Sequence, residues 1–139
     1  MSDRIIRSLF EARLKAWADA RVPTLVIAYE GGTFTPPAGG ATYLRAYLMP
    51  GNTDSEDLAG KHVSYRGVFQ VSVVTASGSG TGTAGAIAEE VAQLYPNNLP
   101  LTKAGFTVYV RSPMATAASF QSETKSTLPL SFQYRADTF

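Results

Sequence analysis

The chain has 139 residues, of which 45% are hydrophobic and 17% charged, and its 12 Lys+Arg against 11 Asp+Glu give a formal net charge of +1. This composition is that of a single folded domain and excludes disorder, while the balanced charge argues against a protein dedicated to the DNA backbone. The absence of cysteine excludes disulfides, thiol catalysis and thiolate metal sites. No apolar run approaches the roughly 18 residues of a membrane span, and the charges at Asp3 and Arg4 predict that the chain is not exported.

A helix and two strands are predicted first along the chain. Apolar side chains recur at helical spacing at Ile6, Phe10, Leu14 and Trp17. Pro23 disfavours helix in the residue before it, so we expect this helix to end by about residue 21. An apolar run over 25–29 predicts a short strand, a Gly/Pro-rich loop follows over 31–42, and alternating polarity predicts a second strand over 43–49.

A long strand and a second helix are predicted next. Residues 50–61 form a second loop, which carries the acidic residues Asp54, Glu56 and Asp57. Period-two alternation over 62–74 predicts a strand of more than average length, in which Gly67 marks a bend or bulge. A Gly-rich lead over 78–82 precedes a helix over about 83–95.

The last two strands are predicted over 106–111 and 128–135, with an irregular stretch over 112–126 between them. The element order is therefore helix, strand, strand, strand, helix, strand, strand. Most of these strands have one polar face, which is typical of antiparallel sheets. We predict an α+β fold in one domain over 1–139, with a mainly antiparallel mixed sheet of about five strands and two helices packed on one face.

Motifs for catalysis, metals and cofactors are weak. The single histidine, His62, lies on the polar side of a strand end, and we interpret it as an ordinary surface or strand-end residue. The acidic residues of the 50–61 loop do not have EF-hand spacing, and the glycines of 78–83 lack the lysine of a phosphate-binding loop. We therefore predict no catalytic residue, no metal and no cofactor. The alternative, a small enzyme with a carboxylate site, would depend on Glu30 and the acidic loop.

The stretch that begins at Arg66-Gly67 invites comparison with an RNA-binding motif. Val68 and Gln70 stand where that motif needs aromatic rings to stack on bases. No direct nucleic-acid recognition is expected.

The predicted outer face of the sheet is rich in tyrosine and arginine, the residue types enriched at protein–protein interfaces. The candidate interface residues on it are Tyr43, Arg45, Tyr47, Arg66, Gln70, Tyr109, Arg111, Gln133 and Arg135. The acidic loop residues Asp54, Glu56 and Asp57 complete the candidate set, because loops of this length often bind partners. Cross-strand pairing on a solvated sheet is the alternative that remains open.

Five stretches carry a family resemblance that runs nearly end to end. They are IAYE at 27–30, YLRAYLMP at 43–50, YRGVFQVSV at 65–73, AIAEEV at 86–91 and PLSFQYRA at 129–136. In this order they resemble the tail terminator-like proteins of long-tailed bacteriophages and prophages.

The resemblance implies a structural role without catalysis or cofactor. Proteins of this kind form a ring, typically of six subunits, on the end of the growing tail tube, stop tube polymerisation and prepare the tail for head joining. The implied partners are copies of the chain itself, the tail tube protein and head–tail connector proteins, with no membrane. The implied location is the virion tail, after assembly in the host cytoplasm. The alternative is another tail-completion or head–tail connector component.

Overall fold

The computed structural model describes residues 2–37, 40–55, 58–78, 82–122 and 124–138. Its elements are α1 (Ser2–Ala20), β1 (Val26–Tyr29), β2 (Tyr43–Pro50), β3 (Val63–Ala76), α2 (Gly82–Leu94), β4 (Pro100–Lys103), β5 (Phe106–Val110), β6 (Ala115–Thr116), β7 (Phe120–Gln121) and β8 (Lys125–Thr138). The predicted α+β class is confirmed, and both helices lie within a residue of their predicted bounds. Within the residues described here, no helix combines the length and the apolar character needed to cross a membrane.

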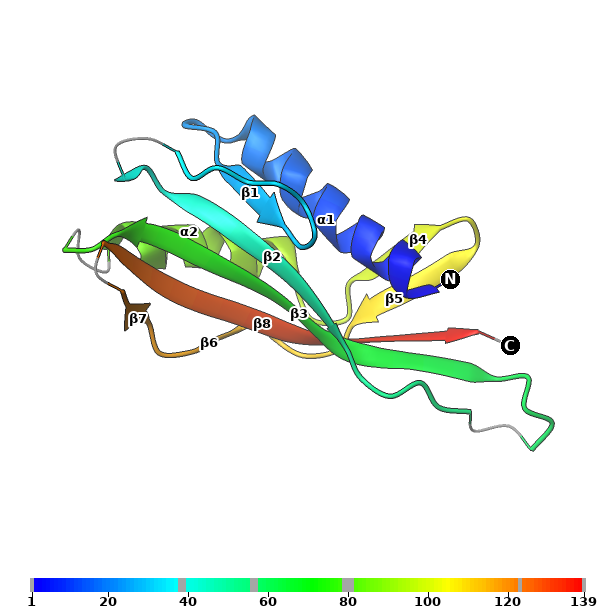
Figure 1. The fold of residues 1–139 in the computed structure, drawn as a ribbon. Helices are drawn as coiled ribbons and strands as arrows, with labels where there is room; N and C mark the ends of the chain where they lie inside the picture. The colour runs from blue at the N-terminus through cyan, green and yellow to red at the C-terminus, as the bar shows by residue number, and fades with distance from the viewer. Residues whose placement is uncertain (1, 38–39, 56–57, 79–81, 123, 139) are drawn as a thin grey trace.

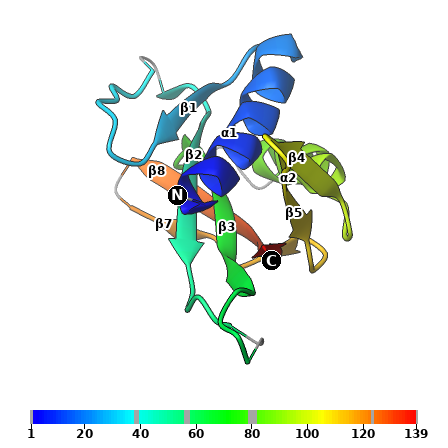
Figure 2. The ribbon, with the colours of Figure 1, turned by 90° about the vertical axis from the view of Figure 1, so that its right-hand side faces the viewer.

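The sheet has eight strands, so the predicted number of about five is wrong. The main order is β1-β2-β3-β8-β5-β4, and the two-residue strands β6 and β7 pair with β8 (Figures 1 and 2). β1 runs parallel to β2, and the other pairs are antiparallel. The predicted mixed, mainly antiparallel sheet is therefore confirmed. It differs from the prediction in its additional short strands.

The strand β4, which was not predicted from the sequence, pairs with β5 through a tight turn. Ala104 and Gly105 connect β4 to β5 with φ angles of 53° and 77°, the left-handed conformation of a two-residue hairpin turn. Alanine rarely adopts this conformation, so Ala104-Gly105 is a weak hairpin signal in the sequence. β4 itself spans four residues, too few for alternation to stand out.

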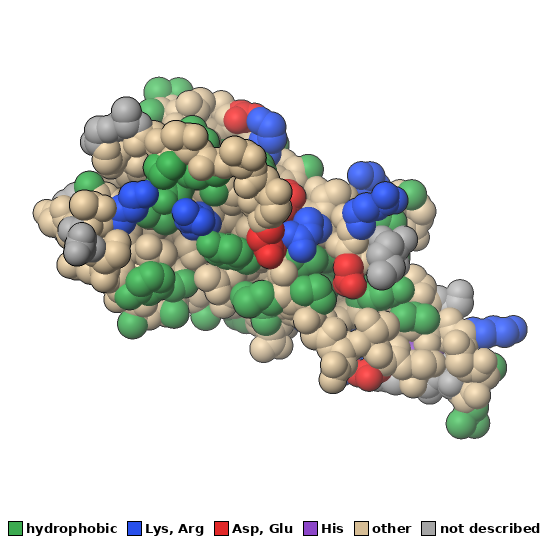
Figure 3. All heavy atoms as spheres, viewed as in Figure 1, with side chains coloured by type: hydrophobic (Ala, Val, Ile, Leu, Met, Phe, Trp, Pro, Cys, Tyr) green, Lys and Arg blue, Asp and Glu red, His purple; other side chains and the backbone are tan. Residues whose placement is uncertain are grey.

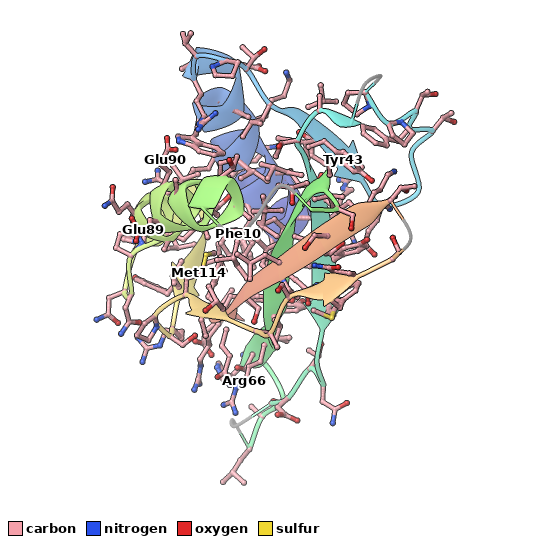
Figure 4. All side chains as sticks on the ribbon, turned by 90° about the vertical axis from the view of Figure 1, so that its left-hand side faces the viewer. Phe10, Tyr43, Arg66, Glu89, Glu90 and Met114 are labelled. Carbon is pink, nitrogen blue, oxygen red and sulfur yellow. The ribbon has the colours of Figure 1, made fainter. Side chains whose placement is uncertain are left out.

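The hydrophobic core is built around Phe10 of α1. Its ring lies 5.1 Å from the rings of both Phe69 in β3 and Phe132 in β8, and 5.7 Å from that of Tyr134. Figure 4 shows Phe10 between its helix and the sheet. Tyr95, directly after α2, is fully buried, and its hydroxyl donates a 2.6 Å hydrogen bond to the Phe10 carbonyl. These contacts connect both helices to the central strands.

The apolar positions that alternate along the central strands are buried in the core, as predicted. The buried members on the core side are Leu44, Ala46 and Leu48 in β2, Phe69, Val71 and Val73 in β3, and Leu130, Phe132 and Tyr134 in β8. The far half of β3 departs from the pattern, because Ser72 and Val74 on the opposite face are buried too. The residues Pro36, Pro37, Gly40 and Ala41 lie beside Val74 and Thr75 around one small pocket, so the 31–42 loop covers part of this face.

Gly67 was predicted to mark a bend or bulge, and the pairing of β3 with β8 excludes the bulge. β3 pairs with β8 in one unbroken register from Val63 to Ala76, and Gly67 is a regular member of it opposite Tyr134. The irregularity lies in residues 51–54, directly after β2. The register changes by one residue between the Pro50–Gly67 pair and the isolated Asp54–Ser64 bridge.

Candidate functional site

The outer sheet face, opposite the core, carries the predicted tyrosine and arginine residues. Register places Tyr47 directly opposite Gln70, and it places Arg135 between Arg66 on one side and Tyr109 on the other. Tyr43 and Arg66 lie at opposite ends of the sheet (Figure 4). The predicted residues therefore extend along the length of this face, and most of them line two neighbouring hollows, which we describe as two surfaces.

Tyr43 is 2% exposed, so the expectation that it faces solvent is wrong. The ring of Phe34, in the covering loop, lies 5.0 Å from the Tyr43 ring, and Lys125 Nζ donates a 3.2 Å hydrogen bond to its hydroxyl. Arg45 holds its guanidinium 5.7 Å from the centre of the same ring. Burial alone would raise the pKa of Tyr43, but hydrogen bonds from Arg45 and Lys125 lower that pKa below its ordinary value. Tyr43 thus fixes the loop to the sheet.

The first of the two surfaces is a shallow groove of about 470 Å³, the β2 groove, between β2 and β7. It is lined by Arg45, Tyr47, Met49, Gln70, Phe120 and neighbouring residues. Phe120 is 60% exposed and Met49 44% exposed, which is unusual for large apolar side chains on a polar sheet face. The sequence does not indicate either as a site residue, because β7 has only two residues and Met49 stands at the end of a predicted strand.

The second surface is the arginine groove, a depression of about 410 Å³ across β3, β8 and the end of β5. Its lining includes Arg66, Val68, Arg111, Gln133 and Arg135. Arg66 and Arg135 are direct cross-strand neighbours, an arrangement that costs stability because like charges repel. Guanidinium groups gathered in this way suit an acidic partner, to which they form strong charged hydrogen bonds.

Asp137 offsets part of this positive charge. Its carboxylate accepts hydrogen bonds from Arg135 Nε at 3.0 Å and Nη2 at 3.2 Å, and it lies 2.8 Å from His62 Nε2. Burial alone would raise the pKa of Asp137, but the hydrogen bonds from Arg135 and His62 lower that pKa below its ordinary value. The network holds the end of β8 against the start of β3.

His62 lies directly before β3, at a strand end as interpreted, but it is 6% exposed and so is not a surface histidine. The ring was expected on the solvated side of a strand end. The strand ladder instead brings Asp137 beside it, because β3 begins at Val63 and pairs from there with the end of β8. A buried polar ring needs such a partner.

Glu30, the alternative catalytic carboxylate, has a structural role. Its Oε1 atom accepts a 2.6 Å hydrogen bond from the Leu48 amide and a 2.8 Å hydrogen bond from Arg7 Nη1. β1 ends at Tyr29, so the Glu30 side chain continues the hydrogen-bonding edge that β1 presents to β2. Within the described ranges, no group of three or more His, Cys, Asp or Glu residues is placed to hold a metal ion.

The described parts of the 50–61 loop project from the end of the sheet, and we call residues 51–55 and 58–62 the arm. Backbone hydrogen bonds pair Gly51 with Arg66 and Asp54 with Ser64, so the arm continues β2 and β3 beyond the body of the sheet (Figures 1 and 2). Asp54 is exposed, while the candidate residues Glu56 and Asp57 lie outside the described residues. Leu58 near the tip is fully exposed, and hydrophobic atoms cap this end of the molecule in Figure 3. Sequence analysis missed Leu58, because one leucine in a polar loop is a weak signal.

The fold and its surfaces define a small α+β domain with two grooves on one sheet face and an arm at one end. No curated protein matches the sequence. A solved structure that bears no functional name is 45% identical to this chain, covering 98% of it and 96% of that structure's own chain with a TM-score of 0.83.

A family model described as "Phage tail terminator protein" matches residues 5–134. The chain therefore belongs to the phage tail terminator family, which confirms the resemblance seen in the sequence. This is a family of structural proteins rather than of enzymes, and membership implies a tail-completion role in the virion tail with other tail or head–tail proteins as partners.

Proposed function

We propose that this chain caps the growing tail tube as an oligomeric ring that ends tube polymerisation and prepares the tail for head joining. Assembly takes place in the host cytoplasm before the tail meets the head. The observation that carries the proposal is the family match over residues 5–134, nearly the whole chain. The function therefore belongs to this domain as a whole and to its surfaces.

The surfaces support a ring physically. A closed ring needs two different patches on each subunit, so that every copy meets the next by the same rotation. The β2 groove, the arginine groove and the arm are three different surfaces, so two of them can meet neighbouring copies. A third surface remains for the tube, because a terminator must bind the last tube ring as well as its own copies.

The β2 groove is our candidate for contact with the tube protein or a neighbouring subunit. Its exposed Phe120 and Met49 provide apolar area, and Tyr47 and Arg45 beside them provide polar ends. Buried aromatic and arginine side chains commonly carry most of the binding energy of an interface.

Deletion of the gene from its phage, with complementation by plasmid-borne variants, tests the proposal. We expect overlong, headless tails without the protein and tails of normal length with heads when the wild type is supplied. Tyr47→Ala should fail to complement while leaving thermal unfolding close to that of the wild type. Lys15→Ala is the matched control, because it alters an exposed ion pair with Asp19 on α1 and should complement fully.

Tails of normal length that carry heads in the deletion strain would refute the proposal. Tails of normal length that lack heads would instead indicate the alternative role, a head–tail connector or other tail-completion component. Immunogold localisation of the protein on purified particles separates the two, because a terminator lies at the upper end of the tail tube.

A further inference from the structure

A β-bulge beside the β2 groove turns the Phe120 side chain to the outer face of the sheet. In β6, Thr116 lies opposite Leu130, which is a core residue. In β7, Phe120 lies opposite Thr127, which lines the β2 groove. Between these two pairs, three residues of the edge segment face only two residues of β8. One extra residue reverses the faces of the side chains that follow it, so Phe120 points outward instead of toward the core.

The β2 groove leaves much apolar surface in water. Phe120 is 60% exposed, and Met49 in the same groove is 44% exposed. Figure 3 shows hydrophobic side chains beside Lys and Arg side chains on the face that carries β2. Removal of apolar surface from water is favourable, and contiguous exposed apolar surface is typical of interaction sites. A bulge that turns a phenylalanine outward therefore indicates a groove that is covered in an assembly.

The polar side of the β2 groove is positively charged. Arg45 lines the groove, and Lys125 lies close by, because the two cations are 5.7 and 5.2 Å from the centre of the same Tyr43 ring. Among the described residues, neither cation forms an ion pair with a carboxylate. The carboxylate of Glu30 in the groove is already bound within the chain. The groove therefore suits a partner that brings a carboxylate next to small or apolar side chains.

The helix α2 has this combination on its outer side. It contains two glutamates and no basic residue, whereas α1 has four basic and three acidic side chains. Glu90 is bound to Arg21, but Glu89 is exposed and forms no ion pair among the residues that the structure describes. Ala86, one helical turn before Glu89, is exposed too. The outer side of α2 therefore presents a carboxylate beside a methyl group.

The outer side of α2 and the β2 groove point in opposite directions. The buried residues of α2 belong to the core on one face of the sheet, and the groove lies on the other face. Figure 4 shows Glu89 on one side of the strands and Tyr43, beside the groove, on the other. The sheet thus separates α2 from the groove of its own subunit. A second copy of the chain can bring its α2 there, and helices on both faces of a sheet are a common layer arrangement.

We propose that the outer side of α2 of each subunit packs in the β2 groove of the next copy of this chain. Glu89 pairs there with Arg45, and Ala86 packs against Phe120. Each subunit presents one helix and one groove, so the contact is the head-to-tail kind that a closed ring repeats. The inference rests on the proposed ring and names the two surfaces that meet in it. The arm and the arginine groove remain for the tube and other tail proteins.

Exchange of the two charges tests the contact. Glu89→Arg and Arg45→Glu, each supplied alone to the deletion strain, should reduce the amount of the protein on purified tails at least about tenfold, because each brings like charges together. The double variant E89R/R45E restores an opposite pair and should recover most of the loss. Asp19→Arg is the matched control, because it reverses an exposed acid on the other helix and should assemble like the wild type.

A cross-link reports the same contact without a change of charge. The chain contains no cysteine, so the variant A86C/Q70C has no background from native thiols. Ala86 is exposed on α2, and Gln70 lines the groove. On assembled tails, a short bismaleimide should give covalent species that increase in size from a dimer to a closed ring on denaturing gels. The single variant A86C, and A86C/V22C with its second cysteine at the 93% exposed Val22, should give no such series.

Two results would overturn the contact between α2 and the groove. One is a wild-type amount of Glu89→Arg on tails, and the other is the absence of species above the A86C background from A86C/Q70C that is present on tails. Thermal unfolding shows whether Arg45→Glu folds, and the cross-link decides alone if it does not. A cross-link from Q70C to the tube protein would also overturn the contact and assign the groove to the tube. None of these results affects the terminator function, which is tested by tail length in the deletion strain.

Discussion

Tyr134 of β8 lies directly opposite Gly67 of β3, and its hydroxyl occupies the space that a β-carbon on Gly67 would need. That carbon would lie 2.5 Å from the Tyr134 hydroxyl and 2.5 Å from the Met49 carbonyl oxygen. Backbone cannot move aside as a flexible side chain does. The strands β2, β3 and β8 therefore approach each other here only because position 67 has no side chain.

Gly67→Ala should destabilise the protein by about 1–3 kcal/mol, the usual cost of overpacking a filled site. Gly85→Ala is the matched control, because a β-carbon on Gly85 in α2 meets nothing within 4 Å. That change should stabilise the protein by about 0.5–1 kcal/mol, since alanine is the better helix former. Urea unfolding of both variants measures the difference, and equal effects would contradict the packing explanation.

The two buried tyrosines of the core should respond oppositely to Tyr→Phe. Tyr95 donates its hydroxyl to the Phe10 carbonyl at 2.6 Å, so Tyr95→Phe should cost about 1 kcal/mol. Among the described residues the buried Tyr134 hydroxyl has no hydrogen-bond partner, and burial raises the pKa of Tyr134 to about 12. Tyr134→Phe removes this unsatisfied group and should stabilise the protein by about 1 kcal/mol. Thermal unfolding of the two variants at neutral pH checks the sign, and a loss in both would refute the contrast.

Acid should weaken the protein in part through Asp137. Its pKa is lower in the folded chain than its ordinary value, so the stability it adds is present at higher pH and is lost as the pH falls through the folded pKa. Asp137→Asn should therefore lower stability at neutral pH and make its decline below about pH 4 less steep. Chemical denaturation across a pH series measures this slope. A slope in the variant as steep as in the wild type would show that Asp137 does not contribute.

Glu30 should matter for stability through its acceptor oxygen. Glu30→Ala leaves the Leu48 amide without its 2.6 Å partner and should cost about 1 kcal/mol. Glu30→Gln keeps an acceptor oxygen and loses only the charge opposite Arg7, so it should cost clearly less. Hydrogen exchange at the Leu48 amide gives a local readout, and we expect faster exchange in the alanine variant alone. Equal exchange in both variants would contradict this role.

The sequence predicts the helices and long strands well. One side of each is buried, so apolar residues recur at the period of a helix or a strand. Phe10 and Phe69 stand at such positions and meet in the core at 5.1 Å. The short strands β4, β6 and β7 leave no such record, because two to four residues cannot show a period. Gly67 predicts a bend or bulge, because a glycine looks the same in the sequence whether the strand bends or a partner ring fills the space beside it.

The candidate site was predicted in part. Alternation correctly placed Tyr47, Gln70 and Arg135 on one sheet face, away from the core. It placed Tyr43 there too, yet Phe34 from the preceding loop folds back over that ring, and periodicity carries no information on such cover. The arm was predicted as an irregular loop, because its register depends on the Asp54–Ser64 backbone bridge rather than on apolar residues. Whether these residues form an interface stays a prediction.

The position of β8 has a consequence for how the nascent chain matures. This strand follows every other strand in chain order, yet it lies between β3 and β5 and also receives β6 and β7. Until the ribosome has made it, the two halves of the sheet have no shared partner, and long-range strand pairing of this kind is slow to form. Co-translational folding should therefore stall at a half-built intermediate, with completion only after β8 emerges, and chaperone binding to nascent chains should peak just before that point.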